Sequence, residues 1–214
     1  MNALDHLPEL GEGLLVSLQL TAISVVFGYA LGLLLAIGVT SPRGFVKWPT
    51  LVIVEIGRGI PALVVLYIVY FGFPALGLVF DSFWSAAIGL TITAGAYSSE
   101  MIRAGIQSVS RGQTEAAAAL GLTATTSFLR IVLPQGLRSA IPPLMGLAIM
   151  SFQATSLAYS ISADELMGAS YRTASVTFEY LEVYAITGLI YAAIAVPATW
   201  LSVLVERRLA RGHA

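Results

Sequence analysis

Charged residues are missing from five long stretches of this chain, and those gaps limit its fold more than any other feature. The uncharged runs are residues 13–42, 59–80, 82–99, 139–163 and 183–205. A charge at the centre of a bilayer is costly, and roughly 20 helical residues cross the hydrocarbon core. We therefore expect an all-α integral membrane protein with five transmembrane helices, at about residues 13–40, 48–72, 82–103, 137–162 and 182–205.

The composition supports a membrane chain and excludes several classes of protein. Hydrophobic residues make up 57% of the 214 residues and charged residues 11%, against about 25% charged in soluble domains. The net charge of −1 argues against a nucleic-acid binder. There is no cysteine, and the two histidines, His6 and His213, lie at opposite ends of the chain. We expect no catalytic site, no metal site and no enzyme activity in this chain.

The remaining charges predict the orientation of the spans. Basic residues collect in three places, at residues 43–47, 103–138 and 207–211, which all lie on one side of a five-span topology. The connections on the other side are mainly acidic. The positive-inside rule then places the N-terminus outside and the C-terminus in the cytoplasm. No repeat or linker divides the chain, so residues 1–214 are expected to form one membrane domain.

The longest cytoplasmic connection, residues 104–136, is predicted to hold two short helices. Thr114 is expected to cap the first, and Gly121 is a natural end for it. Thr123 is expected to cap the second, which Pro134 would end. Two hypotheses remain open on this chemistry: the pair inserts into a groove of another protein, or it lies on lipid headgroups.

The spacing of residues in this connection resembles the EAA motif of bacterial ABC importer permeases. That motif reads E-A-A, three residues, G, nine residues, then I-x-L-P. Its positions are met here by Glu115, Ala116, Ala117, Gly121, Ile131, Leu133 and Pro134. The resemblance implies that the two short helices couple the permease to a groove of a separate ATPase subunit.

Further segments resemble the polar amino acid branch of this family. Residues 55–61 resemble its E-x-x-R-G-x-P signature, residues 96–105 its A-Y-x-x-E-x-x-R-x-G, and residues 153–157 its fourth span. The similarity extends over roughly residues 10–208. It implies a type I importer permease fold in a bacterial inner membrane, working with ATPase subunits, a second permease and an extracytoplasmic amino acid-binding protein. Gln153 resembles the glutamate/aspartate permeases, which favours glutamate, aspartate or glutamine as the cargo.

The energy source must lie outside this chain. It has a single lysine, Lys47, and no G-K-[ST] sequence, so it lacks a P-loop. ATP and Mg²⁺ are therefore expected on a partner ATPase, and no cofactor is expected here. The alternative is a secondary amino acid transporter or channel subunit driven by an ion gradient.

Polar residues inside the expected spans are candidates for the substrate pathway. Arg58 is expected about ten residues into the second span, near mid-bilayer, either facing the pathway or paired with Glu55. Gln153, Thr155 and Ser156 in the fourth span either line the pathway or bond neighbouring helices. Glu100 and Arg103 share the same spacing and are expected to form an interfacial ion pair.

Overall fold

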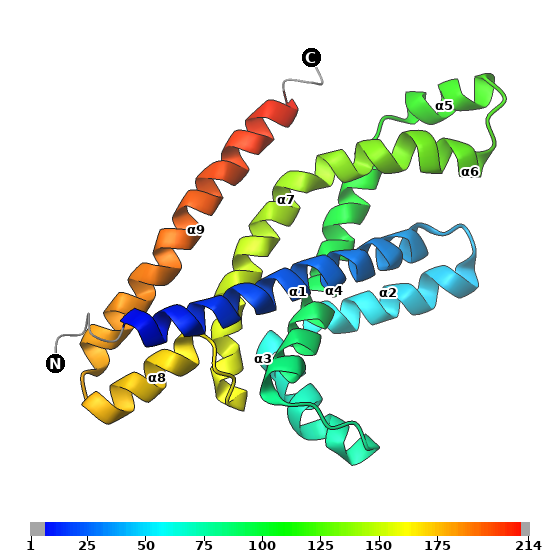
Figure 1. Cartoon of the computed structure of the whole chain (residues 1–214). Coiled ribbons are helices and arrows are strands. Elements are labelled where there is room, and N and C mark those ends of the chain that lie inside the picture. Colours follow the sequence, from blue (N-terminus) through cyan, green and yellow to red (C-terminus); the bar gives the residue numbers. More distant parts are fainter. Residues whose placement is uncertain (1–6, 211–214) are drawn as a thin grey trace.

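The computed structural model describes residues 7–210, and every regular element within that range is helical (Figure 1). The α-helices are α1 (Leu7–Thr40), α2 (Gly44–Gly59), α3 (Ala62–Tyr67), α4 (Ser82–Gln107), α5 (Arg111–Ala119), α6 (Ala124–Ser127), α7 (Leu133–Ala154), α8 (Leu166–Thr177) and α9 (Tyr180–Ala210). Short π- or 3-10-helical segments extend several of them: η2 (Ile68–Gly72), η3 (Phe73–Leu76), η4 (Phe128–Val132) and η5 (Thr155–Ile161). The expected all-α class is confirmed for this range.

The core is built where α1 crosses α4, and α4 packs in turn on α7. Two glycines on α1 make the close crossing possible. A Cβ on Gly28 would lie 2.7 Å from the Cβ of Ala94, and a Cβ on Gly32 would lie 2.0 Å from Oγ of Ser98. Small residues let helix backbones approach in this way, and dispersion contacts then hold them together in lipid.

The second expected span is not one continuous helix. α2 ends at Gly59, and the helical stretch from Ala62 to Leu76 leaves at 102° to it. Pro61 explains the break, because it has no N–H to donate and disfavours a helical conformation at the residue before it. Ile60 is accordingly extended, with φ −87° and ψ 127°. Arg58 therefore lies in the last turn of α2, directly before the bend, and not inside a continuous helix.

Three described helices are long and apolar enough to cross a membrane on their own: Leu7–Thr40, Ala124–Ile161 and Tyr180–Leu209. The bent α2–α3 pair adds a fourth if it counts as one span. The expected third span corresponds to α4, which has 26 residues and carries Glu100 and Arg103 near its end. Five spans with the stated orientation stays a prediction.

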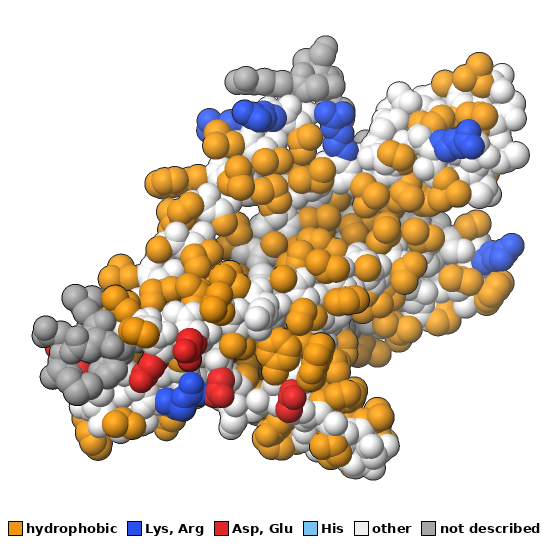
Figure 2. Space-filling view, in the orientation of Figure 1, with side chains coloured by type: hydrophobic (Ala, Val, Ile, Leu, Met, Phe, Trp, Pro, Cys, Tyr) orange, Lys and Arg blue, Asp and Glu red, His pale blue; other side chains and the backbone are white. Residues whose placement is uncertain are grey.

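The charged side chains are separated along the molecule. On the face shown in Figure 2, Lys and Arg lie over the end of α9, over the α5–α6 region and at the α1–α2 turn. Asp and Glu lie at the opposite end, near α8, the start of α1 and the region of α3 and the start of α4, and Arg172 lies beside Asp164 there. We call these the basic end and the acidic end of the molecule.

Helix α8 at the acidic end was not anticipated. Glu165 caps it, accepting hydrogen bonds from the backbone N–H groups of Met167 at 2.9 Å and Gly168 at 2.8 Å. The helix then packs its buried face on α1 and α9. Residues 166–177 thus form a short helix that joins the expected fourth and fifth spans.

Candidate functional site

The loop at the basic end contains the two predicted short helices, but the first begins earlier than expected. Ser110 caps α5, with its hydroxyl accepting a hydrogen bond from the N–H of Gly112 at 3.3 Å. Thr114 lies inside the helix, and its hydroxyl donates to the carbonyl of Arg111 at 2.7 Å. The prediction of Thr114 as the cap was wrong, because Ser110 offers the same chemistry one turn earlier.

Gly121 ends α5 in the predicted manner. Its φ is +76°, in the left-handed region that favours glycine. The N–H of Gly121 donates to Ala118 at 2.9 Å, and the N–H of Leu122 donates to Ala117 at 3.0 Å. This pair of bonds is the Schellman motif, which satisfies the last carbonyls of a helix.

The second short helix begins as predicted but does not end at Pro134. Thr123 caps α6 by accepting from the N–H of Thr126 at 3.2 Å. The helix continues through the π-helical segment η4, where the N–H of Leu133 donates to the carbonyl of Phe128, and runs into α7. The wider π turn accommodates the missing N–H of Pro134, so the chain stays helical. The predicted stop at this proline was wrong.

The EAA-type residues divide into exposed and anchoring positions. Glu115, Ala116 and Gly121 are exposed, as is Pro134, whereas Ala117 is the buried residue of α5. Leu133 is half-buried and packs on a core cluster that includes Ile102 and Ala140; it joins the loop to α4 and α7. An open crevice of about 400 Å³ separates α5 from α6 and η4. The loop therefore projects from the helices that anchor it through Leu133, and it exposes the charged side chain of Glu115.

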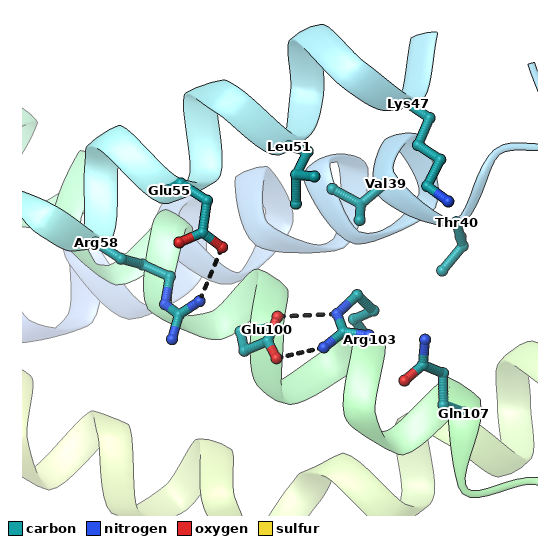
Figure 3. A pocket seen from close by; sticks show the side chains of 9 residues that line it. All are labelled: Val39, Thr40, Lys47, Leu51, Glu55, Arg58, Glu100, Arg103 and Gln107. Carbon is teal, nitrogen blue, oxygen red and sulfur yellow. Dashed lines mark hydrogen bonds and ion pairs between the residues drawn. The ribbon is translucent and has the colours of Figure 1, made fainter. Parts of the chain in front are cut away.

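A second candidate site is a cavity of about 470 Å³ between α1, α2 and α4 (Figure 3). Its lining residues are Val39, Thr40, Lys47, Leu51, Glu55, Arg58, Glu100, Arg103 and Gln107. Nη1 of Arg58 lies 3.4 Å from Oε1 of Glu55. Arg103 contacts Glu100 through two bonds, Nε to Oε2 at 2.9 Å and Nη2 to Oε1 at 2.5 Å. The expected Glu100–Arg103 ion pair is therefore formed, and so is the Glu55–Arg58 pair, which was the alternative to a pathway role for Arg58.

The polar residues of the fourth span do not join this cavity. Thr155 is fully buried, and its hydroxyl donates to the carbonyl of Phe152 at 2.7 Å. The hydroxyl of Ser156 donates to the carbonyl of Gln153 at 2.8 Å, and the Gln153 side chain is exposed. The structure thus separates the five pathway candidates into Glu55 with Arg58, and Gln153 with its neighbours.

A fully buried carboxylate was missed by sequence reasoning. Glu165 has no exposed surface, and its Oε2 accepts hydrogen bonds from Ser17 at 3.2 Å and Tyr191 at 3.1 Å. Ser17 lies on α1 and Tyr191 on α9, so the side chain connects three helices. Burial raises the pKa of this carboxyl, while the donated hydrogen bonds oppose the rise. The available signal was an acidic residue directly before an apolar helical run.

Among residues 7–210, no group of three or more His, Asp or Glu residues could hold a metal ion. The two histidines lie outside the described residues.

Comparison with known proteins gives one consistent result. Residues 28–211 match the family described as binding-protein-dependent transport system inner membrane component. The chain is 34% identical over 208 residues to the probable amino-acid ABC transporter permease protein YckA of Bacillus subtilis, covering 97% of this chain and 92% of that protein. It is 38% identical over 216 residues to the glutamate/aspartate import permease protein GltK of Escherichia coli, covering 95% of each.

Solved structures agree with the sequence relatives. One chain from the crystal structure of an amino acid ABC transporter with histidines matches with a TM-score of 0.90 and 32% identity, over 96% of both chains. A chain of the MetNI methionine ABC transporter matches with a TM-score of 0.74 at 20% identity, over 92% of this chain and 96% of that one, which supports the fold alone. The predicted family is confirmed: the chain belongs to the inner membrane components of binding-protein-dependent transport systems, the ABC importer permeases.

Proposed function

We propose that this chain is the permease subunit of an ABC importer for polar amino acids and that it forms half of the translocation pathway. The observation that supports this best is the loop at the basic end. It carries the EAA-type residues on a projecting pair of short helices, closed at Gly121 and anchored through Leu133. Such a surface suits insertion into a groove of a partner protein. A separate ATPase subunit would bind ATP and Mg²⁺ and drive the cycle through this contact.

The proposed assembly places two permeases side by side in a bacterial inner membrane, either two copies or one copy with a similar chain. Each would contribute five spans: α1, the bent α2–α3 segment, α4, the helix from Ala124 to Ile161, and α9. The separation of charge supports an external N-terminus and a cytoplasmic C-terminus. An amino acid-binding protein would then dock at the acidic end.

The proposed cargo is glutamate, aspartate or glutamine. Relatives of similar identity are named for L-cystine, arginine, glutamine and glutamate/aspartate transport. Gln153 favours the glutamate/aspartate group, and its side chain is exposed on its helix, as a pathway residue has to be. Arg58 and Glu55 are the second part of the proposed pathway, and Thr155 is assigned to packing because its hydroxyl is already bonded inside the helix.

The test of this proposal is the energy source of uptake. Proteoliposomes would hold the chain with its ATPase, and its binding protein would be supplied outside with radiolabelled glutamate, glutamine, arginine or cystine. We expect uptake to require enclosed ATP and to persist when ionophores collapse the proton and sodium gradients. Uptake that follows an imposed gradient without ATP would instead support a secondary transporter.

A further inference from the structure

We propose that the cavity between α1, α2 and α4 is a carboxylate-binding site anchored by Arg58, and that it receives the α-carboxylate of the transported amino acid. This inference rests on the proposed function and adds a binding site at the basic end of the permease. Three cationic side chains, Lys47, Arg58 and Arg103, line the cavity with two anionic ones, Glu55 and Glu100. One bound carboxylate would balance these charges.

Arg58 has donors to spare in this cavity; the ammonium of Lys47 also lines it, 5.8 Å from the centroid of the Trp48 ring, but lacks a guanidinium's paired geometry. A guanidinium has five N–H donors, and a carboxylate matches two of them side by side. Arg103 already makes that paired contact with Glu100, at 2.9 and 2.5 Å. Arg58 makes one long contact of 3.4 Å to Glu55, and its Nε is buried with no hydrogen-bond partner. A buried donor without a partner favours any ligand that supplies an acceptor.

The surrounding helices hold Arg58 in place over the cavity. A Cβ on the preceding residue, Gly57, would lie 2.9 Å from the Cβ of Ala96, so the end of α2 sits close against α4. The hydroxyl of Tyr97 on α4 donates to the backbone carbonyl of Arg58 at 3.1 Å. The backbone is thus fixed, while the side chain of Arg58 is 33% exposed and lines the cavity (Figure 3). A fixed backbone lowers the entropic cost of ordering this side chain around a ligand.

The size and position of the cavity suit a small organic carboxylate. Its 470 Å³ falls within the range of about 300–1,000 Å³ typical of small-molecule sites. The lining includes Lys47 near the α1–α2 turn and Gln107 at the last residue of α4, so the cavity lies toward the basic end. In the proposed orientation that end is the cytoplasmic exit. Cargo would therefore meet Arg58 late in transit, after it passes the region of Gln153.

Direct binding to the purified permease–ATPase complex, without the external binding protein, tests the site. Labelled L-glutamate, L-glutamine, L-arginine and L-cystine would each be measured by scintillation proximity. For the amino acid that binds most tightly, we expect Arg58→Gln to weaken binding by roughly tenfold to a hundredfold. Arg58→Lys keeps the charge and loses the paired geometry, so it should fall between the wild type and Arg58→Gln.

Glu55→Gln separates a binding role from a structural ion pair. If Glu55 and Arg58 only stabilise α2, the two neutral variants should have equal effects on binding. In the proposed site Glu55 competes with the ligand for Arg58, so Glu55→Gln should bind the ligand more tightly than the wild type does. The amide derivative of the tightest-binding amino acid, which lacks the α-carboxylate, should lose affinity for the wild type and change little between the wild type and Arg58→Gln.

The outcomes distinguish this inference from the proposed function. Absence of ATP-driven uptake by the wild-type transporter would overturn the proposed function itself. Normal uptake with no direct binding of any of the four amino acids would overturn the site alone. So would Arg58→Gln binding as tightly as the wild type, with the thermal midpoint of the complex confirming that the variant is folded.

Discussion

Two ionisable side chains, Glu165 at the acidic end and Arg58 at the basic end, differ in their burial and in their hydrogen bonds. Glu165 is fully buried, and its two oxygens accept four hydrogen bonds from α1, α8 and α9. The side chain of Arg58 is one-third exposed and lines a cavity, with one long contact and a buried Nε that has no partner. A buried polar group whose hydrogen bonds are all made stabilises a fold, whereas a buried polar group without a hydrogen-bond partner favours a ligand. We therefore expect an architectural role for Glu165 and a ligand-binding role for Arg58.

Removal of the Glu165 carboxylate should give the largest loss of stability. Glu165→Ala leaves the hydroxyls of Ser17 and Tyr191 and two backbone N–H groups without their acceptor, and it opens a small cavity. We expect a cost on the order of 3–5 kcal/mol in the free energy of unfolding, measured by thermal unfolding in detergent. The neighbour Asp164, 74% exposed and paired with Arg172 at the surface, is the matched control. Asp164→Ala should cost less than about 1 kcal/mol. Equal effects of the two variants would contradict an architectural role for Glu165.

Gly13 tests the packing around this carboxylate. A Cβ at Gly13 would lie 2.8 Å from the Cβ of Ala169 and 3.0 Å from the carbonyl oxygen of Glu165. Gly13→Ala should therefore push α8 away from α1, at a cost of about 1–3 kcal/mol. Gly188 on α9 has nothing within 4 Å of an added Cβ, so Gly188→Ala should be neutral or stabilise the helix by up to about 1 kcal/mol. Equal melting temperatures of Gly13→Ala and Gly188→Ala would show that α1 and α8 move apart at little cost.

Gly121 at the basic end is constrained by its backbone conformation, whereas Gly13 is constrained by the space around it. An added Cβ would meet nothing within 4 Å, but its φ of +76° strains any residue with a branched side chain. Gly121→Val should cost about 1–2 kcal/mol locally and leave the chain inserted at normal levels. Substrate-stimulated ATP hydrolysis and uptake should both collapse, because the turn between α5 and α6 changes its angle. Gly121→Asn, which tolerates this conformation, should retain most of both activities. Full activity of the valine variant would show that the loop does not transmit the motion of the ATPase.

The smallest effect concerns pH. Glu165 lies between η5 and α8, outside the helices that could span a membrane, and burial raises its pKa above the ordinary value. A raised folded-state pKa means that this carboxyl stabilises the fold fully below its unfolded pKa, near 4.3. That contribution is lost as the pH rises through the folded-state pKa. The wild type should therefore melt at a slightly lower temperature as the pH rises through this window. Glu165→Gln should flatten the slope, and an unchanged slope would assign it to other groups.

The helical class, the family and much of the loop could be predicted because each depends on local chemistry. Gly121 needs a left-handed turn, and Thr123 caps the helix that follows, whatever surrounds them. The errors came from choices between similar local options. Ser110 and Thr114 are both good caps, and Pro134 ends a helix only where no π turn accommodates it.

The arrangement of the two polar sites could not be predicted, because it depends on contacts distant in sequence. Glu165 bonds Ser17, 148 residues earlier in the chain. The cavity around Arg58 exists because α2 lies beside α4, with Tyr97 held to the end of α2. Arg58 and Gln153 were predicted together as pathway residues, yet the cavity that Arg58 lines does not include Gln153.

The break at Pro61 also gives Arg58 a source of stabilisation that does not depend on Glu55. Aligned peptide dipoles place about half a negative charge at the C-terminus of a helix, and Arg58 lies in the last turn of α2. In an unbroken helix the same residue would lie far from either end, where this field is weak. The end of α2 therefore favours a positive charge at this position, and in the proposed site that field would persist while Glu55 gives way to a ligand.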